Sequence, residues 1–140
     1  MRTSAKLLFA LLLPLAACRR GAPLPVALAP DDMCAYCKMA VSEKAYAAEF
    51  LSRDGDAVKF DDIGCMRKYV AARQNRAEID AVYVMTVDEK QWRKAEEAFF
   101  VRSDRFHTPM GGGIVAFRVR ARAEAEAGAG KVLSWADVQP

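Results

Sequence analysis

The sequence predicts an α+β fold with antiparallel sheet, arranged as two small ββαβ units after a signal peptide and a flexible tether. Two observations carry this prediction. An Asp-Gly pair separates two short apolar runs, as in a β-hairpin, and a capped helix and a further strand follow. The order strand, strand, helix, strand then recurs, which places the halves at about 31–87 and 98–136, and the second strand of each half ends in a phenylalanine, Phe60 or Phe117.

The first half begins with the hairpin. Asp54-Gly55 lies between the predicted strands 45–52 and 56–60. Asp61 and Asp62 are N-cap residues for a helix over about 63–74, and the branched and aromatic run 81–87 is the next strand. Asp88 is expected to cap a short helix that runs through Trp92 and Ala95.

The second half alternates short strands with a glycine-rich loop and a helix. Proline and three glycines in "HTPMGGG" exclude a regular element there, and Gly128 and Gly130 end a helix. The predicted elements are strand 98–101, loop 107–113, strand 114–119, helix 120–127 and strand 131–135.

The N-terminus predicts export and lipid anchoring. Residues 1–17 have a basic start and an apolar run too short to span a bilayer, as in a signal peptide. Leu15-Ala16-Ala17-Cys18 resembles a bacterial lipobox, which implies that Cys18 becomes the lipidated first residue. Arg19 after that cysteine favours the outer membrane over the inner one in the periplasm. The proline-rich residues 18–30 are then a tether, and 31–140 form the domain.

Charge excludes nucleic-acid binding as the main role. The full chain has 21 basic and 18 acidic residues, and removing the signal peptide takes away Arg2 and Lys6. The mature protein is therefore almost neutral, and it lacks the basic field that contacts with phosphates require.

The stretch "MCAYCKM" at 33–39 concentrates sulfur and allows three interpretations. A redox dithiol would use Cys34 and Cys37, but such a pair commonly follows a strand and begins a helix, and neither signal is present. A structural zinc site would use Cys34, Cys37, Cys65 and His107, the only histidine, and would leave the methionines unexplained.

A Cu(I) site uses the methionines as well, because Cu(I) prefers thiolate and thioether sulfur at low coordination number. Cys37 and Met39 would point to one face of an extended segment, with Cα atoms about 6–7 Å apart. Met110, next to Pro109 in the glycine-rich loop, is the predicted third ligand, and His107 is a further candidate.

The chain also resembles the NosL family, the nitrous oxide reductase accessory lipoproteins, over essentially the whole mature sequence. The residues that carry the resemblance are Cys18, "CAYCKM" (34–39), "FDDIGC" (60–65), Trp92 to "AFFV" (98–101) and "TPMGGGIVAF" (108–117). The resemblance implies paired ββαβ units and a periplasmic copper chaperone that delivers Cu(I) for the copper–sulfide centre of nitrous oxide reductase. Cys37, Met39 and Met110 match the family's metal-binding positions.

The resemblance implies a binding protein and not an enzyme. Its expected partners are apo nitrous oxide reductase, or the transporter complex that matures it, and the membrane through lipid on Cys18. The alternative is a lipid-anchored thiol–disulfide oxidoreductase or redox sensor that uses Cys34 and Cys37.

Two features of this chain concern the family pattern directly. The family commonly has glycine where this chain has Lys38. Cys65 lies in the first helical turn, where the helix dipole lowers a thiol pKa, and we expect it to form a disulfide with Cys34 that leaves Cys37 free for metal.

Overall fold

The computed structural model describes residues 23–73 and 78–140. The predicted signal peptide and Cys18 lie outside these residues. The helices and strands are η1 (Lys44–Tyr46), β1 (Ala48–Ser52), β2 (Ala57–Phe60), α1 (Ile63–Arg73), β3 (Ile79–Met85), β4 (Trp92–Lys94), η3 (Ala95–Glu97), β5 (Phe99–Arg102), β6 (Ile114–Phe117), α2 (Arg120–Ala127) and α3 (Trp135–Val138).

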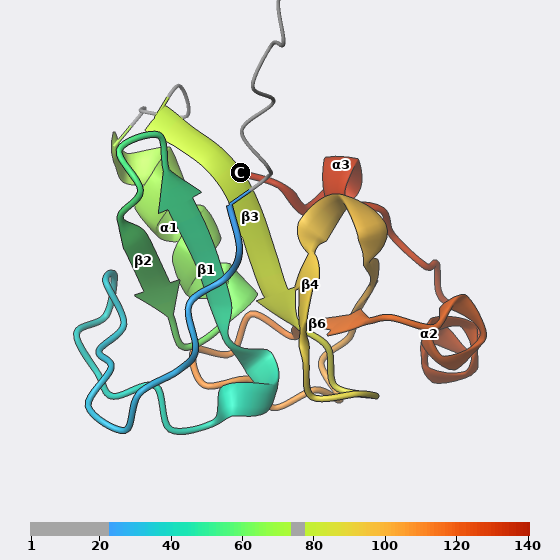
Figure 1. Ribbon diagram of the computed structural model, residues 1–140. Helices are drawn as coiled ribbons and strands as arrows, with labels where there is room; N and C mark the ends of the chain where they lie inside the picture. The colour runs from blue at the N-terminus through green and yellow to red at the C-terminus, as the bar shows by residue number, and fades with distance from the viewer. Residues whose placement is uncertain (1–22, 74–77) are drawn as a thin grey trace, which may run out of the picture.

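Two antiparallel sheets form the framework and confirm the predicted α+β class (Figure 1). The larger sheet has the strand order β2-β1-β3-β4, and β5 pairs with β6 in the smaller one. A single parallel bridge between Thr86 and Ala116 joins the two sheets. The first unit is therefore the predicted β1, β2, α1 and β3, with β4 added at the sheet edge.

The β1–β2 hairpin and α1 form where local sequence signals predict them. Gly55 has a φ of +94°, a turn conformation that glycine adopts without a Cβ penalty. The Asp62 carboxylate accepts a hydrogen bond from the Cys65 backbone N–H at 2.7 Å, which is the expected N-cap of α1. α1 packs on one face of the sheet, where Tyr69 contacts Phe50 and Phe60 with ring centroids 5.2 to 6.0 Å apart.

The second unit contains β5, β6 and α2, with α2 at the predicted residues. Phe117, at the end of β6, is buried with Ala123 of α2, just as Phe60 at the end of β2 is buried beside α1. The expected final strand 131–135 is reduced to one antiparallel bridge, in which Phe100 and Leu133 exchange two backbone hydrogen bonds of 2.9 and 2.7 Å. The chain then turns into α3, which has a capping box.

The short helix expected after Asp88 is wrong. Trp92–Lys94 form strand β4, which pairs with β3, and only the single 3₁₀ turn η3 follows. Asp88 instead accepts hydrogen bonds from the backbone N–H groups of Arg118 and Val119, which lie 30 residues or more away in sequence. A cap residue identified from local pattern is thus used for a long-range contact.

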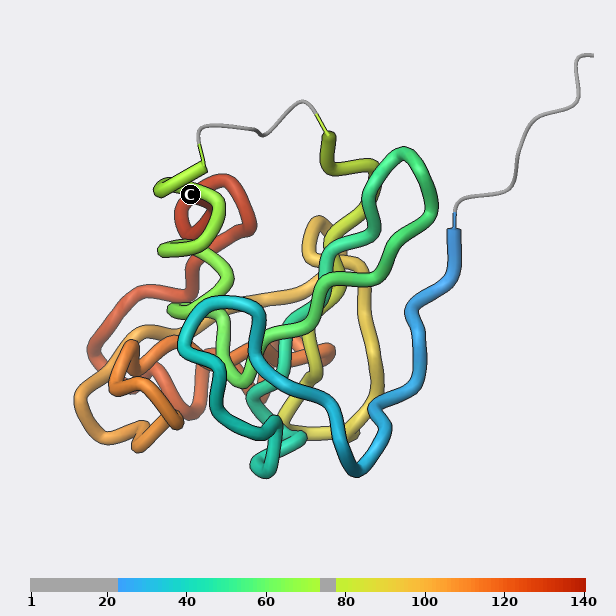
Figure 2. Tube along the Cα trace, turned by 90° about the vertical axis from the view of Figure 1, so that its left-hand side faces the viewer, coloured from blue at the N-terminus to red at the C-terminus, as the bar shows by residue number. Residues whose placement is uncertain are grey.

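Residues 23–30, assigned to the tether from sequence, run along the sheet face opposite α1 (Figures 1 and 2). The buried Glu49 carboxylate on β1 accepts a hydrogen bond from the Val26 N–H at 2.9 Å, and the Tyr83 hydroxyl donates to the Pro23 carbonyl at 2.6 Å. Lys59 donates to the Ala27 carbonyl at 2.8 Å. This part of the predicted tether is therefore packed onto the domain.

Candidate metal centre

The cysteine-rich segment 33–40 folds into a closed loop beside β2. Met33 and Ala40 form an antiparallel bridge at its base, and the Cys34 N–H donates to the Met39 carbonyl at 2.8 Å. Within the loop, the Lys38 N–H donates to the Cys34 carbonyl at 3.0 Å. These bonds fix the backbone that carries Cys34 and Cys37.

Lys38 has a φ of +65°, in the left-handed region, so the extended geometry expected for residues 37–39 is wrong. Glycine, which the family resemblance implies at this position, adopts the left-handed conformation without strain. In this chain the Lys38 ammonium donates to the Ala35 carbonyl at 2.8 Å and closes the turn.

The link between β2 and α1 supplies the other side of the site. Phe60 ends β2, and Asp61 and Asp62 follow before the helix begins at Ile63. Cys65 is the third residue of α1 and lies on its buried face. The same tight link therefore places the Asp61 side chain and the Cys65 thiol near each other.

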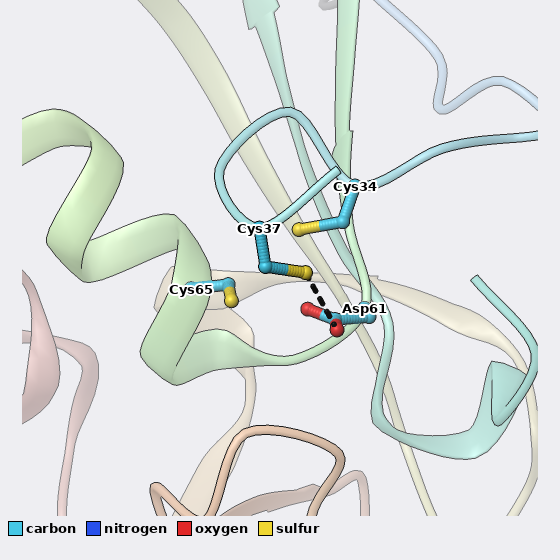
Figure 3. Close-up of side chains that lie close together, drawn as sticks. All are labelled: Cys34, Cys37, Asp61 and Cys65. Atoms are coloured by element: carbon cyan, nitrogen blue, oxygen red, sulfur yellow. Dashed lines mark hydrogen bonds between the residues drawn. The ribbon is translucent and has the colours of Figure 1, made fainter. Parts of the chain in front are cut away.

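Four side chains converge from these two segments (Figure 3). The sulfur atoms of Cys34, Cys37 and Cys65 and a carboxylate oxygen of Asp61 all lie within 4.8 Å of one another. Cys34, Asp61 and Cys65 are buried, and Cys37 is half-buried. The Cys37 thiol donates a hydrogen bond to Asp61 Oδ2 at 3.2 Å. All three cysteines are free thiols, so the expected Cys34–Cys65 disulfide stays a prediction.

Burial favours the protonated form of the Cys37 and Cys65 thiols. It raises the pKa of the Cys65 thiol, and the neighbouring Asp61 carboxyl and Cys34 raise it further. The expected lowering of the Cys65 pKa by the helix dipole is therefore wrong, because desolvation outweighs it. Burial also raises the pKa of Cys37, with contributions from Asp61 and Cys34 in the same direction, although the Met39 N–H opposes them. A metal ion must displace these protons to bind.

Asp62 holds the glycine-rich loop between β5 and β6 against the first turn of α1, the turn that also carries Cys65. This buried carboxylate uses Oδ1 for the helix cap and Oδ2 to accept a hydrogen bond from the Met110 N–H at 3.0 Å. The loop backbone lies close to the first turn of α1, where a Cβ added at Gly112 would lie 3.4 Å from the Gly64 Cα. Met110 is half-buried and packs against the main core.

The structure brings some of the predicted ligands together and leaves others outside the cluster. Cys34, Cys37 and Cys65 come together, and Asp62 ties the Met110 loop to the same helix turn. Met39, in loop 33–40, is 60% exposed. His107 is exposed and does not belong to the thiol cluster. Sequence reasoning missed Asp61, which it assigned to capping. The available signal was its position directly between a buried strand end and Cys65.

Within residues 23–73 and 78–140, the protein has no helix that is both long and apolar enough to cross a bilayer.

The fold and the cluster define a small α+β protein in which three thiols and a carboxylate lie close enough together to hold a metal ion. The chain belongs to the NosL family, which it matches over residues 25–140. Its fold is similar to that of the copper chaperone NosL from Shewanella denitrificans, with a TM-score of 0.73 and 19% sequence identity over 84% of this chain and 96% of that one. None of the curated proteins compared with it matches.

Proposed function

We propose that this chain is a periplasmic, lipid-anchored Cu(I) chaperone that delivers copper for assembly of nitrous oxide reductase or a related cuproprotein. The observation that carries the proposal is the convergence of two buried thiols with the half-buried Cys37 thiol, beside α1 to which the Met110 N–H is joined through Asp62. The family membership and the similarity in fold to a copper chaperone support it.

The ligand chemistry favours Cu(I). Thiolate and thioether are soft ligands, and Cu(I) accepts two or three of them. Cys37 is the half-buried thiol, Met39 is 60% exposed in the same loop, and Met110 is half-buried in the loop between β5 and β6, where its N–H is bonded to Asp62. We assign these three residues as the Cu(I) ligands, with Cys34, Cys65 and His107 as further candidates.

Release of copper requires that a partner reach the metal directly. Met33, Tyr36 and Met39 expose 55%, 41% and 60% of their surface around the Cys37 loop. Clustered exposed apolar side chains are typical of surfaces that contact another protein. We propose that an incoming thiolate, thioether or imidazole replaces one ligand at a time, so that Cu(I) passes to the partner without turnover chemistry.

The partners proposed are apo nitrous oxide reductase and the transporter complex that matures it. Lipid on Cys18 would hold the chaperone at the membrane, with the outer membrane proposed from Arg19. Incubating the Cu(I)-loaded protein with apo nitrous oxide reductase tests the client. Copper should move to the enzyme, and copper that stays on the donor would point to another client.

The alternative role in thiol–disulfide exchange is less well supported. Attack on a disulfide needs a thiolate, and the raised pKa of Cys37 keeps the most accessible thiol protonated. Moreover, Cys37 lies in a turn and not at the N-terminus of a helix, where the dipole would favour a thiolate.

The decisive experiment is an anaerobic Cu(I) titration of the reduced protein against a competing Cu(I) chelator, followed by thiolate-to-copper charge transfer. Wild type should bind one copper per chain. Met110→Leu should weaken binding at least as much as loss of an outer-shell partner does, about 10- to 100-fold. Met33→Leu is the matched control, because Met33 is exposed outside the ligand set.

Two results would contradict the proposal or part of it. Failure of the wild type to compete with the chelator would exclude the chaperone function. Equal affinities for Met110→Leu and Met33→Leu would remove Met110 from the site while leaving a thiolate-only Cu(I) site in place.

A further inference from the structure

A basic groove lies between α1 and the second unit, and the copper chemistry proposed above does not use it. Its volume is about 460 Å³. Arg67 and Lys68 line it from α1, and Arg102 lines it from the end of β5. Among residues 23–73 and 78–140, no acidic side chain contributes to the lining. The groove therefore presents three positive charges without a negative one.

These three charges are not neutralised by the protein itself. The ion pairs in the described part of the chain all involve other basic residues. Arg67 Nε is buried and lacks a hydrogen-bond partner there. Burial lowers the pKa of the Arg67 guanidinium, and the positive charge of the neighbouring Arg102 lowers it further. An anion in the groove would relieve this repulsion, and arginine binds carboxylates through paired N–H donors.

The rest of the lining is small or apolar. A Cβ added at Gly64 would lie 3.5 Å from the Gly112 Cα, so the backbones of α1 and the glycine-rich loop are close together. Ala71, Ile114 and Pro140 add apolar surface. A free inorganic anion would bind the basic groups and leave this surface uncovered. A peptide segment that carries carboxylates and small apolar side chains would cover both, as in protein interfaces with an apolar centre and a polar rim.

The groove borders the proposed copper ligands. Gly112 follows Met110 by two residues in the same loop, and Gly64 directly precedes Cys65 on α1. A partner segment seated in the groove would therefore place the rest of the partner beside the candidate metal centre. Docking at this position uses none of the metal ligands.

The side of the molecule on which the groove lies favours a protein over the membrane as its ligand. Residues 23–30 run along the sheet face opposite α1 (Figures 1 and 2). If Cys18 carries lipid, as proposed, the anchored segment reaches the domain on the side away from α1. A headgroup of the same bilayer is then the less favourable source of the anion.

We propose that this groove is a docking surface for a carboxylate-rich segment of the protein that exchanges copper with this chain. Carboxylates of the partner pair with Arg67, Lys68 and Arg102, and its small apolar side chains cover the apolar lining. Opposite charges on the two surfaces also speed their encounter. The inference rests on the proposed function, because it identifies the chemistry of the partner in copper exchange.

A peptide probe tests the groove on the metal-free, reduced full-length chain. The probe is a blocked peptide in which glutamate alternates with alanine, and its control has glutamine in place of glutamate. In an NMR titration, the Gly64 and Gly112 amide signals should shift and saturate with the acidic peptide only. Equal shifts with the neutral peptide, or none with either, would overturn the proposal. Inorganic phosphate that binds as tightly as the acidic peptide would also overturn it, because the groove would then be an anion site only.

Arg102→Glu reverses one charge of the groove at an exposed position. It should weaken binding of the acidic peptide at least about tenfold, because like charges across a docking surface oppose binding. Arg122→Glu is the matched control, since Arg122 is exposed on α2 outside the groove, and it should keep wild-type affinity. Lys68→Glu, exposed on α1, takes the place of Arg102→Glu if a thermal melt shows that the latter does not fold. Wild-type affinity in a folded groove variant would overturn the proposal.

Copper transfer separates the docking surface from the chaperone function. Arg102→Glu should keep wild-type Cu(I) affinity against a chelator and deliver copper to apo nitrous oxide reductase about tenfold more slowly than Arg122→Glu. Raising the salt from about 0.1 M to about 1 M shortens the Debye length from about 10 Å to about 3 Å, and it should slow the wild type toward the rate of Arg102→Glu. Equal rates for the two variants would overturn docking through the groove. Failure of the wild type to bind Cu(I) would instead exclude the chaperone function, and the peptide titration would still decide whether the groove binds carboxylates.

Discussion

Asp62 joins the two units of the protein, and Asp62→Asn tests how strongly. One carboxylate oxygen caps α1 through the Cys65 N–H at 2.7 Å, and the other holds the Met110 N–H at 3.0 Å. Asparagine has one acceptor oxygen. Because the cap lies deeper, we expect the amide to keep the Cys65 bond and to turn its NH₂ group toward Met110.

The expected cost follows from these two contacts. An N–H group left facing another donor costs about 1–3 kcal/mol, and loss of the negative charge at the helix N-terminus costs about 0.3–1 kcal/mol more. The free energy of unfolding should therefore fall by about 1–4 kcal/mol, a sizeable share of the roughly 5–15 kcal/mol that is typical of small domains.

Two measurements on the metal-free, reduced protein check this prediction. Urea unfolding gives the change in stability, and amide hydrogen exchange should show lost protection at Met110 with little change at Cys65. Asp80→Asn, exposed on β3, should stay within about 0.5 kcal/mol of wild type. An Asp62→Asn variant as stable as this control, with Met110 still protected, would refute the role of Asp62 as the connection.

Three further predictions concern backbone strain and charge. A Cβ at Gly113, where φ is +60°, would lie 2.6 Å from the Ser103 carbonyl oxygen, whereas a Cβ at Gly111 would meet nothing within 4 Å. In urea unfolding, Gly113→Ala should therefore lose about 1–3 kcal/mol more stability than Gly111→Ala. Equal losses of stability in the two variants would show that the loop backbone shifts to relieve the contact at Gly113. Lys38→Gly should stay within about 1 kcal/mol of wild type in a thermal melt, whereas Lys38→Val should lose about 1–3 kcal/mol because a branched side chain disfavours positive φ. Burial raises the pKa of the Glu49 carboxyl above its ordinary value of 4.5, so the contribution of this group to stability is complete below pH 4.5 and is lost as the pH rises through the folded-state pKa. Glu49→Gln should therefore gain about 1 kcal/mol or more over wild type between acid and neutral pH, and a pH-independent difference would contradict this.

Elements whose signals are local were predictable from the sequence. The Asp54-Gly55 turn fixes the hairpin, Asp62 fixes the start of α1, and Gly128 ends α2 at the predicted residue. The segment after Asp88 failed because its strand depends on pairing with β3 and its acidic residue on backbone groups near residue 118. Neither partner is visible within a window of neighbouring residues.

The candidate site, like the fold, was predictable from the sequence only where its signals are local. The spacing of Cys34 and Cys37 and the identity of Met110 indicated metal chemistry without any coordinates. The approach of Asp61 to Cys37 required knowing that loop 33–40 folds over the end of β2. The direction of the cysteine pKa shifts likewise depends on burial, which the helical position of Cys65 alone does not reveal.

The packing of residues 23–30 against the sheet shortens the segment of chain between the domain and the proposed lipid anchor. If Cys18 carries lipid, as proposed, only the chain from Cys18 to Pro23 separates the anchor from the packed segment, a span of at most about 18 Å when fully extended. The domain would then explore a thin layer at the membrane surface instead of the width of the periplasm. Such confinement raises the effective concentration of the chaperone toward partners embedded in or docked on the same membrane.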